Sequence, residues 1–428
     1  MRQQHHGLLR HGLLIFILAG TGLRLLLPFF DSPMDHLFSD PQRHWDNAGR
    51  FLHPLLMNGC DPLGYQVFLF LTRKLSFDNR FVLNLFTGIL SAAMPWLYYR
   101  AARSLGLEQK PAAMFWSFML WMPSFLVIYS FFMVETLLLP LMGLGLWMTG
   151  RALRRKDLPS FLLMTVCWTL AALTKAQALL PLILCCGYAL WQMPRRIPAL
   201  IAALALTALM LIPNTLRTRS ILGFPSPFGN SCLARIMHAG GTKHTQFYWE
   251  NGRRETLIYS SPSCYIHPLE PLNEWRIGRG DGENTMEVVI HRKNGRNDWT
   301  AALAGVRRSA SVWLQHLGEN VVLFLFAPSW PETSHEGFPG AISRWQRWLW
   351  APLIFQVLIG NAAFLIRRPI PLLPLLTSAM LLVLCFQNSV TMEGRYRKPL
   401  EPLLLLNFIW LCSKSGAAGG GTPKESGL

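Results

Sequence analysis

The chain has 428 residues, of which 51% are hydrophobic and 15% charged, and its formal net charge is +17. A soluble domain carries about 25% charged residues, so this composition indicates many membrane-spanning segments. It excludes collagen, a coiled coil, a disordered chain and a small disulfide scaffold. The positive charge would suit nucleic-acid binding, but Lys and Arg also concentrate on the cytosolic side of membrane proteins.

Long apolar stretches predict an all-α polytopic membrane protein with about ten transmembrane helices. We expect an N-terminal transmembrane module over 1–213, C-terminal transmembrane helices over 347–413 and a disordered cytosolic tail over 414–428. The first helix resembles a signal peptide but lacks a small-x-small cleavage site, so we expect it to be retained. The predicted spans are 12–30, 81–99, 111–129, 131–150, 159–174, 176–193, 197–213, 348–366, 369–386 and 399–413.

The charged residues orient these spans. With the N-terminus in the cytosol, the inner segments hold fifteen Lys and Arg residues against three acidic residues. The positive-inside rule therefore places both termini in the cytosol. Outside lie an acidic first loop over 31–79 and a mixed segment over 214–346 with an interfacial helix. Most of the +17 thus reflects orientation, and the chain needs no nucleic-acid partner, only membrane lipids.

Two features near the outer surface are interpreted structurally. Arg24 lies near the outer end of the first span, where snorkelling to the interface is favoured over a phosphate contact. Cys232 and Cys264 lie in the outer segment, where an oxidising compartment would allow a disulfide between them. The sequence has no CxxC pair or metal-ligand spacing, so a structural zinc site is not expected.

The first outer loop holds two candidate acids, Asp40 and Asp46. A carboxylate at a membrane surface can accept a proton from an attacking hydroxyl. The competing interpretation is that Asp40 caps a helix whose first residue is Pro41, and that Asp46 is a solvated helix residue. The spacing of six residues by itself favours this structural interpretation.

Glu135 and Lys175 are isolated charges at the outer ends of apolar spans. An ionisable group at that depth is costly unless it is partnered or faces a wet cavity, so Glu135 is a functional candidate. The Lys175 ammonium could neutralise a lipid phosphate. Snorkelling explains Lys175 equally well.

The segment Glu393-Gly-Arg-Tyr-Arg-Lys-Pro399 places three cations outside, against the charge bias. The forks of Arg395 and Arg397 match phosphate oxygens, and Tyr396 could stack or hydrogen-bond beside them. Arg217, at the start of the large outer segment, adds a further phosphate donor. Headgroup binding without catalysis is the alternative.

Five motifs, in their order and in their common position on the outer side of the membrane, resemble the GT-C glycosyltransferase superfamily. The resemblance is closest to its bacterial branch, which is related to protein O-mannosyltransferases and the aminoarabinose transferase of lipid A. The motifs are Asp-x-x-x-His-Trp-x-x-Ala from Asp40, Glu135, Thr174-Lys175, Asn214-x-x-Arg217 and Glu393-x-Arg-Tyr-x-x-Pro399. The resemblance covers nearly the whole chain. It implies a GT-C-like helix bundle and a polyprenyl-phosphate-linked sugar donor.

The resemblance also implies roles for single residues. Asp40 takes the position of the base or acceptor-orienting residue, and Glu135 that of the second acid. Lys175, Arg395 and Arg397 would hold the donor phosphate. The family often has Asp-Glu where this chain has Asp40-Pro41. This difference leaves open whether Asp46 replaces the missing acid, and whether Asp40 and Glu135 bind a divalent metal; no other cofactor is implied.

We therefore expect an inverting glycosyltransferase, a hexosyl- or pentosyltransferase, with its active site on the periplasmic or luminal side of the membrane. A bacterial inner membrane is preferred over the endoplasmic reticulum, because the loops are compact and the sequence shows no ER-retrieval signal. Its acceptor would be the hydroxyl of a glycan, lipid or protein. An O-antigen ligase or polysaccharide polymerase uses the same lipid class but relies mainly on outer Arg and His residues. A transporter of lipid-linked glycans should show polar groups deep in several spans and repeat symmetry, which the sequence lacks.

Overall fold

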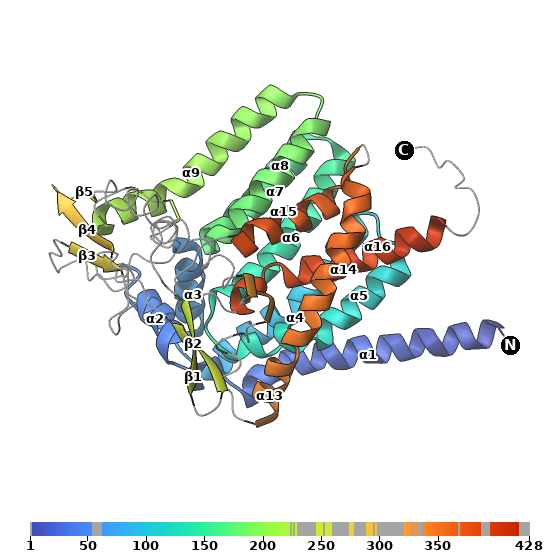
Figure 1. Ribbon diagram of the computed structural model, residues 1–428, viewed down its shortest axis with the longest axis horizontal. Helices are drawn as coiled ribbons and strands as arrows, with labels where there is room; N and C mark the ends of the chain where they lie inside the picture. The colour runs from blue at the N-terminus through green and yellow to red at the C-terminus, as the bar shows by residue number, and fades with distance from the viewer. Residues whose placement is uncertain are drawn as a thin grey trace.

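A computed structural model describes residues 2–53, 62–222, 337–366, 369–386 and 394–418, together with five strands between 245 and 297 and a few isolated positions (Figure 1). The body is helical, and the strands form two small antiparallel sheets, β1-β2 and β3-β4-β5. In Figure 1, α2 and α3 lie at one end, whereas α1 begins and α16 ends toward the other.

The described elements follow one another in chain order. The N-terminal helices are α1 (Arg2–Phe30), α2 (Ser39–Gly49), α3 (Leu63–Ser76), α4 (Arg80–Ser104), α5 (Gln109–Trp121), α6 (Val134–Arg155), α7 (Leu158–Thr174), α8 (Leu179–Gln192) and α9 (Arg196–Leu222). The strands are β1 (Thr245–Glu250), β2 (Arg253–Ile258), β3 (Glu274–Ile277), β4 (Val288–Lys293) and β5 (Arg296–Asn297). The C-terminal helices are α13 (Gly337–Trp345), α14 (Arg347–Leu365), α15 (Leu372–Phe386) and α16 (Glu401–Ala418). Short 3-10 turns are η1 (Pro33–Asp35), η3 (Pro123–Phe125), η4 (Val127–Ser130), η5 (Ala176–Ala178) and η8 (Gly394–Arg397).

Each of the ten predicted spans contains a helix. Among the described residues, five helical segments are long and apolar enough to cross a membrane: those of α1, α4, α6, α9 and α13–α14. A sixth results if α5 and the bent η3–η4 segment count as one span, while α7, α8 and α15 are shorter apolar helices. The fold therefore suggests a multi-pass membrane protein, and the count of ten crossings stays a prediction.

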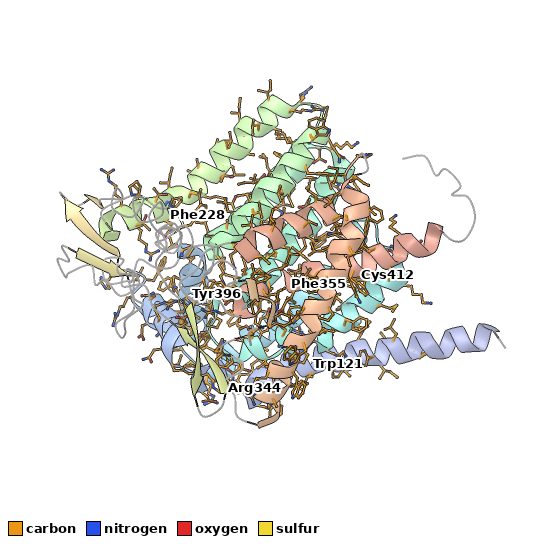
Figure 2. The ribbon with its side chains drawn as sticks, in the orientation of Figure 1. Trp121, Phe228, Arg344, Phe355, Tyr396 and Cys412 are labelled. Atoms are coloured by element: carbon orange, nitrogen blue, oxygen red, sulfur yellow. The ribbon has the colours of Figure 1, made fainter. Side chains whose placement is uncertain are left out.

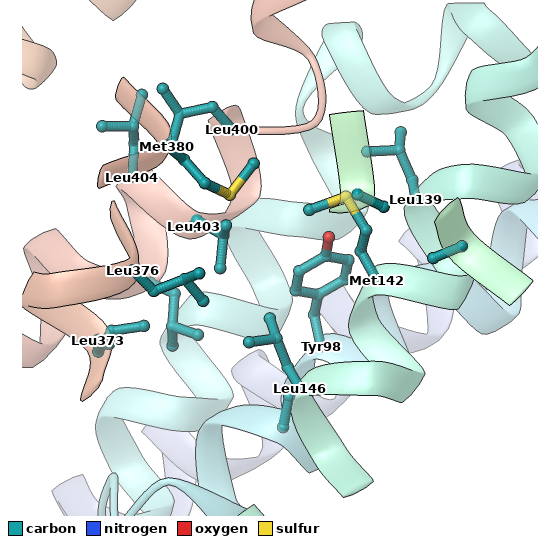
Figure 3. Packing of buried hydrophobic residues seen from close by; sticks show 14 of the residues in the cluster. Tyr98, Leu139, Met142, Leu146, Leu373, Leu376, Met380, Leu400, Leu403 and Leu404 are labelled. Carbon is teal, nitrogen blue, oxygen red and sulfur yellow. The ribbon is translucent and has the colours of Figure 1, made fainter. Parts of the chain in front are cut away.

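Helix α6 packs against α4 on one side and α7 on the other. Two glycines permit this close approach: a Cβ on Gly143 would lie 2.8 Å from the Tyr98 ring, and one on Gly145 would lie 2.7 Å from Trp168. Small residues at helix contacts are typical of membrane bundles. Figure 3 shows the apolar core beside Tyr98, where Met142 and Leu146 of α6 face leucines of α15 and α16.

The predicted third span is broken. Its two halves, α5 and η3–η4, meet at an angle of 70° at Met122-Pro123. Arg24 of α1 is fully buried at this break and donates to the backbone oxygens of Leu120 at 2.9 Å, Met119 at 2.7 Å and Phe125 at 2.7 Å. Snorkelling of Arg24 is therefore wrong: its guanidinium binds carbonyls that the bend leaves without helical donors.

The first outer loop, predicted over 31–79, contains the two helices α2 and α3. Phe38 precedes α2, and Asp40 lies within the first turn, so the prediction that Asp40 caps this helix is wrong. The His44 Nδ1 atom lies 3.0 Å from the Gln66 amide nitrogen, and the His44 ring contacts Tyr65 edge-on. These buried contacts fix α2 against α3 and so set the position of Asp40.

Candidate functional site

Four segments that are distant in sequence meet at one site: α2, the first turn of α6, the end of α7 and the turn η8. Asp40 accepts a hydrogen bond at 2.8 Å from Nη1 of Arg395 in η8, and its other oxygen pairs with Arg43 one helical turn away. Arg395 comes from the segment before the last helix, so this pair joins α2 to the turn that precedes α16. The predicted base and a predicted phosphate ligand are thereby brought together.

A second ion pair lies next to the first. Lys175 Nζ donates to Glu135 Oε1 at 2.6 Å and lies 5.2 Å from the centre of the Tyr396 ring. Glu135 stands in the first turn of α6, where the helix dipole favours a negative charge. Lys175 follows the last residue of α7, at the break before η5, and its side chain reaches the buried carboxylate of Glu135 on α6.

Arg395 and Tyr396 connect the two pairs. The Arg395 guanidinium carbon lies 5.7 Å from the Tyr396 ring centre, and its charge also acts on Glu135. Tyr396 lies within the body of the molecule, toward the end that carries α2 and α3 (Figure 2). We call this group, which is Asp40, Arg43, Glu135, Lys175, Arg395 and Tyr396, the ion-pair cluster.

The members of the ion-pair cluster differ in accessibility. The side chains of Asp40, Lys175 and Arg395 are 20%, 14% and 11% exposed, whereas that of Glu135 is 0% exposed. A ligand can therefore contact the first three directly, but it meets Glu135 only through Lys175. Among the described residues of the cluster, three cations face two carboxylates, a balance of one positive charge that suits an anionic ligand.

The charge state of Asp40 follows from its neighbours. Burial would raise the pKa of this carboxyl, but the charges of Arg43 and Arg395, with the hydrogen bond from Arg395, outweigh burial and hold the pKa well below its usual range. Asp40 is therefore an ionised carboxylate at neutral pH. While both arginines hold it, it is a weak proton acceptor, because basicity falls with pKa.

Arg397 does not face this cluster. It is 1% exposed, and it donates from Nε to Glu401 Oε1 at 3.0 Å and from Nη1 to the Leu325 carbonyl at 3.0 Å. Lys398 is equally buried and donates to the backbone oxygen of Ser124 at 2.7 Å. The geometry therefore favours a structural role for Arg397 over the predicted phosphate contact.

Two further predicted residues, Asp46 and Arg217, lie outside the ion-pair cluster. Asp46 is exposed on α2, and six helical residues place it about 120° around the helix from Asp40. Arg217 is buried on α9 and donates to Asn214 Oδ1 at 2.8 Å on the same helix. Cys232 and Cys264 lie outside the described residues.

A metal at Asp40 and Glu135 would compete with the cations already bound to them. Both Asp40 oxygens bond to arginines, and Lys175 holds one oxygen of Glu135. Within the described ranges, no group of three or more His, Cys, Asp or Glu side chains is placed to hold a metal ion. A divalent metal would have to displace these cations, and the need for one stays a prediction.

Sequence reasoning missed three residues that support the site. Arg43 lies inside the first motif but was not singled out, and Ser124 and Glu401 anchor the segment that carries Arg395. Two signals could have found the last two residues. Pro123 marks a helix break beside Ser124, and Glu401 is an acid within an apolar stretch, where a charge needs a partner.

Comparison of the chain with protein-family models and with curated proteins gives no match.

Proposed function

We propose that this protein is an integral membrane glycosyltransferase that transfers a sugar from a polyprenyl-phosphate donor to an acceptor hydroxyl. The single observation that carries the proposal is the meeting of Asp40, Lys175 and Arg395, three partly accessible charges from separate segments. A carboxylate beside cations suits a reaction in which a hydroxyl loses a proton while a phosphate leaves. The resemblance to GT-C glycosyltransferases supports the same reaction.

The chemistry assigns one step to each accessible group. The acceptor hydroxyl gives its proton to Asp40 as its oxygen bonds to the anomeric carbon. The bond from that carbon to the phosphate oxygen breaks, and the phosphate takes the electron pair. Lys175 and Arg395 stabilise the negative charge on the departing phosphate. A single displacement of this kind inverts the anomeric configuration, and Asp40 later releases its proton to water.

In this proposal Arg395 exchanges partners. The incoming donor phosphate competes with Asp40 for the Arg395 guanidinium, and a bidentate bond to phosphate is a strong alternative. As Arg395 turns to the phosphate, Asp40 loses one of the charges that depress its pKa and becomes a better base. Glu135 stays buried, holding the Lys175 ammonium in place, which changes its role from second acid to support.

The proposed setting is a bacterial inner membrane with the ion-pair cluster on the periplasmic side and both termini in the cytosol. The orientation rests on the distribution of Lys and Arg over the short loops. The placement of both termini in the cytosol also requires the predicted ten crossings. The acceptor is the hydroxyl of a glycan, lipid or protein. A polysaccharide ligase or polymerase is less favoured, because the cluster is built around the carboxylate of Asp40.

The test compares two aspartates of the same helix. Purified protein with a labelled polyprenyl-phosphate sugar should show transfer, and Asp40→Asn should lower turnover roughly 10²- to 10⁴-fold. Asp46→Asn is the matched control, since Asp46 is exposed on α2, and it should keep turnover within about twofold. A folded Asp40→Asn protein with wild-type turnover would exclude Asp40 as the base.

A further inference from the structure

The segment from Gly394 to Glu401 has two sets of contacts. Arg395 and Tyr396 belong to the ion-pair cluster, where Arg395 bonds to Asp40 and the Tyr396 ring lies beside Lys175. The next two residues, Arg397 and Lys398, turn inward and are buried. Both sets lie on or directly after one turn of 3-10 helix, η8, in which Lys398 N–H donates to the Arg395 carbonyl at 3.2 Å. The inward contacts therefore fix where the outward side chains lie.

Ser124 is the centre of the inward contacts. Its hydroxyl donates to Glu401 Oε2 at 2.5 Å and accepts from Lys398 Nζ at 3.0 Å, while its backbone oxygen accepts from the same ammonium at 2.7 Å. Glu401 also accepts from Arg397 Nε at 3.0 Å. All four residues are at most 1% exposed, so these bonds form away from solvent.

Ser124 is available because the predicted third span is broken. The chain bends at Met122-Pro123, and Ser124 lies in η3 immediately after the bend. Arg24 holds both sides of this bend, bonding to Leu120 on one side and to Phe125 on the other. The bend thereby presents a fixed serine to the segment that precedes α16.

We infer that Ser124 is a positioning residue, which acts through Lys398 and Glu401 to hold Arg395 where it can bind the donor phosphate. This inference rests on the proposed function, because it assumes that Arg395 binds a phosphate. Ser124 does not itself contact the ion-pair cluster in these bonds. Its substitution should weaken phosphate binding only because Arg395 is no longer held in position.

The test measures equilibrium binding of radiolabelled polyprenyl monophosphate to the full chain in nanodiscs. Arg395→Gln should weaken binding directly, and Ser124→Ala should weaken it by about 10-fold, since small displacements of a positioned group are costly. In the Arg395→Gln background, Ser124→Ala should change affinity by less than about twofold. A general loss of folded structure would instead weaken binding equally in both backgrounds.

Ser130 provides the matched control. It is fully buried in η4, six residues after Ser124, and within the described residues its hydroxyl makes no hydrogen bond. Ser130→Ala should therefore bind the probe as the wild type does. Ser124→Thr, which keeps the hydroxyl, should restore most of the affinity. If Ser124→Ala does not fold, Ser124→Cys keeps the size of the side chain with a weaker donor and should show the same loss in part.

The outcomes separate the two proposals. Unchanged binding by Arg395→Gln would overturn the phosphate site itself. Weaker binding by Arg395→Gln, together with wild-type binding by Ser124→Ala, would leave the phosphate site standing and overturn the positioning role of Ser124. Equal losses for Ser124→Ala and Ser130→Ala would also overturn that role.

Discussion

Arg395 donates from Nη1 to Oδ2 of Asp40 at 2.8 Å, although 355 positions separate the two residues in the chain. This bond joins helix α2 to the turn that precedes the last helix, α16. Because both side chains are partly accessible, the bond is held within the protein yet open to competition from an anion. It is therefore the contact whose loss should report most directly on the ion-pair cluster.

Arg395→Gln should destabilise the protein in a pH-dependent way. The pKa of Asp40 is lower in the folded protein than in the unfolded chain, so its ion pairs stabilise the fold above the unfolded pKa of about 3.9. That stabilisation is lost as the pH falls below this value toward the folded pKa. Thermal unfolding in detergent should show a gap between wild type and variant at pH 6 that narrows below about pH 4.

Arg80→Gln is the control for this pH dependence. Arg80 pairs with Asp35 near the same end of the bundle, but the two side chains are 57% and 46% exposed. Solvent screens such a pair, so its loss should cost at most about 1 kcal/mol at any pH. A gap for Arg395→Gln that is independent of pH would mean that Asp40 does not depend on Arg395 for its ionisation.

Glu135→Gln and Lys175→Met should each be costly, and the double variant should cost less than their sum. Each single change leaves one buried or nearly buried charge without its counter-charge, which should lower the free energy of unfolding by about 3 kcal/mol. Removing both charges leaves neither unpaired. A double-mutant cycle on thermal or denaturant unfolding measures the coupling, which should exceed about 1 kcal/mol.

The same cycle on Arg80 and Asp35 should give a coupling near zero, because that pair is exposed. Additive costs for Glu135 and Lys175 would show that the short contact between them contributes little to the fold. Glu135 would then not be the residue that holds Lys175.

Arg24→Lys should destabilise the protein by about 3 kcal/mol although it keeps the charge. The guanidinium serves several backbone oxygens on both sides of the bend, through three separate nitrogens. A lysine has one nitrogen and cannot reach them all, so carbonyls at the bend lose their donors. Arg195→Lys, at an exposed position between α8 and α9, is the control and should have little effect. Equal stability of both variants would favour snorkelling of Arg24 after all.

The part of the fold that could be predicted is the set of long helices, because the length of each apolar stretch indicates them. All ten predicted spans contain a helix, because long apolar stretches between charged turns have few other structures in a membrane. The bend at Pro123 could also have been predicted from the proline. Helix α3 (Leu63–Ser76) was missed because it is short and lies between charged residues, so its sequence reads as part of a loop.

The candidate site was only partly predictable, for a different reason. Glu135 and Lys175 were found because an isolated charge at the end of a span needs a partner. Arg395, Arg397 and Lys398 look alike in sequence, and only the 3-10 turn decides that the first faces Asp40 while the others turn inward. Ser124 carries no charge and so gave no electrostatic signal.

The proposed side of the ion-pair cluster can be tested by cysteine labelling. Helix α4 (Arg80–Ser104) has 25 residues, about 37 Å at 1.5 Å per residue, which is enough to cross a hydrocarbon core of about 30 Å. In a cysteine-free background, Arg80→Cys should react with a membrane-impermeant maleimide in intact cells. Lys110→Cys, which is exposed just after the other end of α4, should react only after the cells are opened.

Lys414→Cys in that background gives an independent check from the C-terminal half of the chain. Lys414 is exposed on α16, just after the predicted span 399–413, so this cysteine should be protected in intact cells as Lys110→Cys is. Protection of Arg80→Cys with labelling of Lys414→Cys would place the ion-pair cluster on the cytosolic side. The acceptor would then be cytosolic, and a periplasmic transferase would be excluded, whatever Asp40 and Arg395 bind.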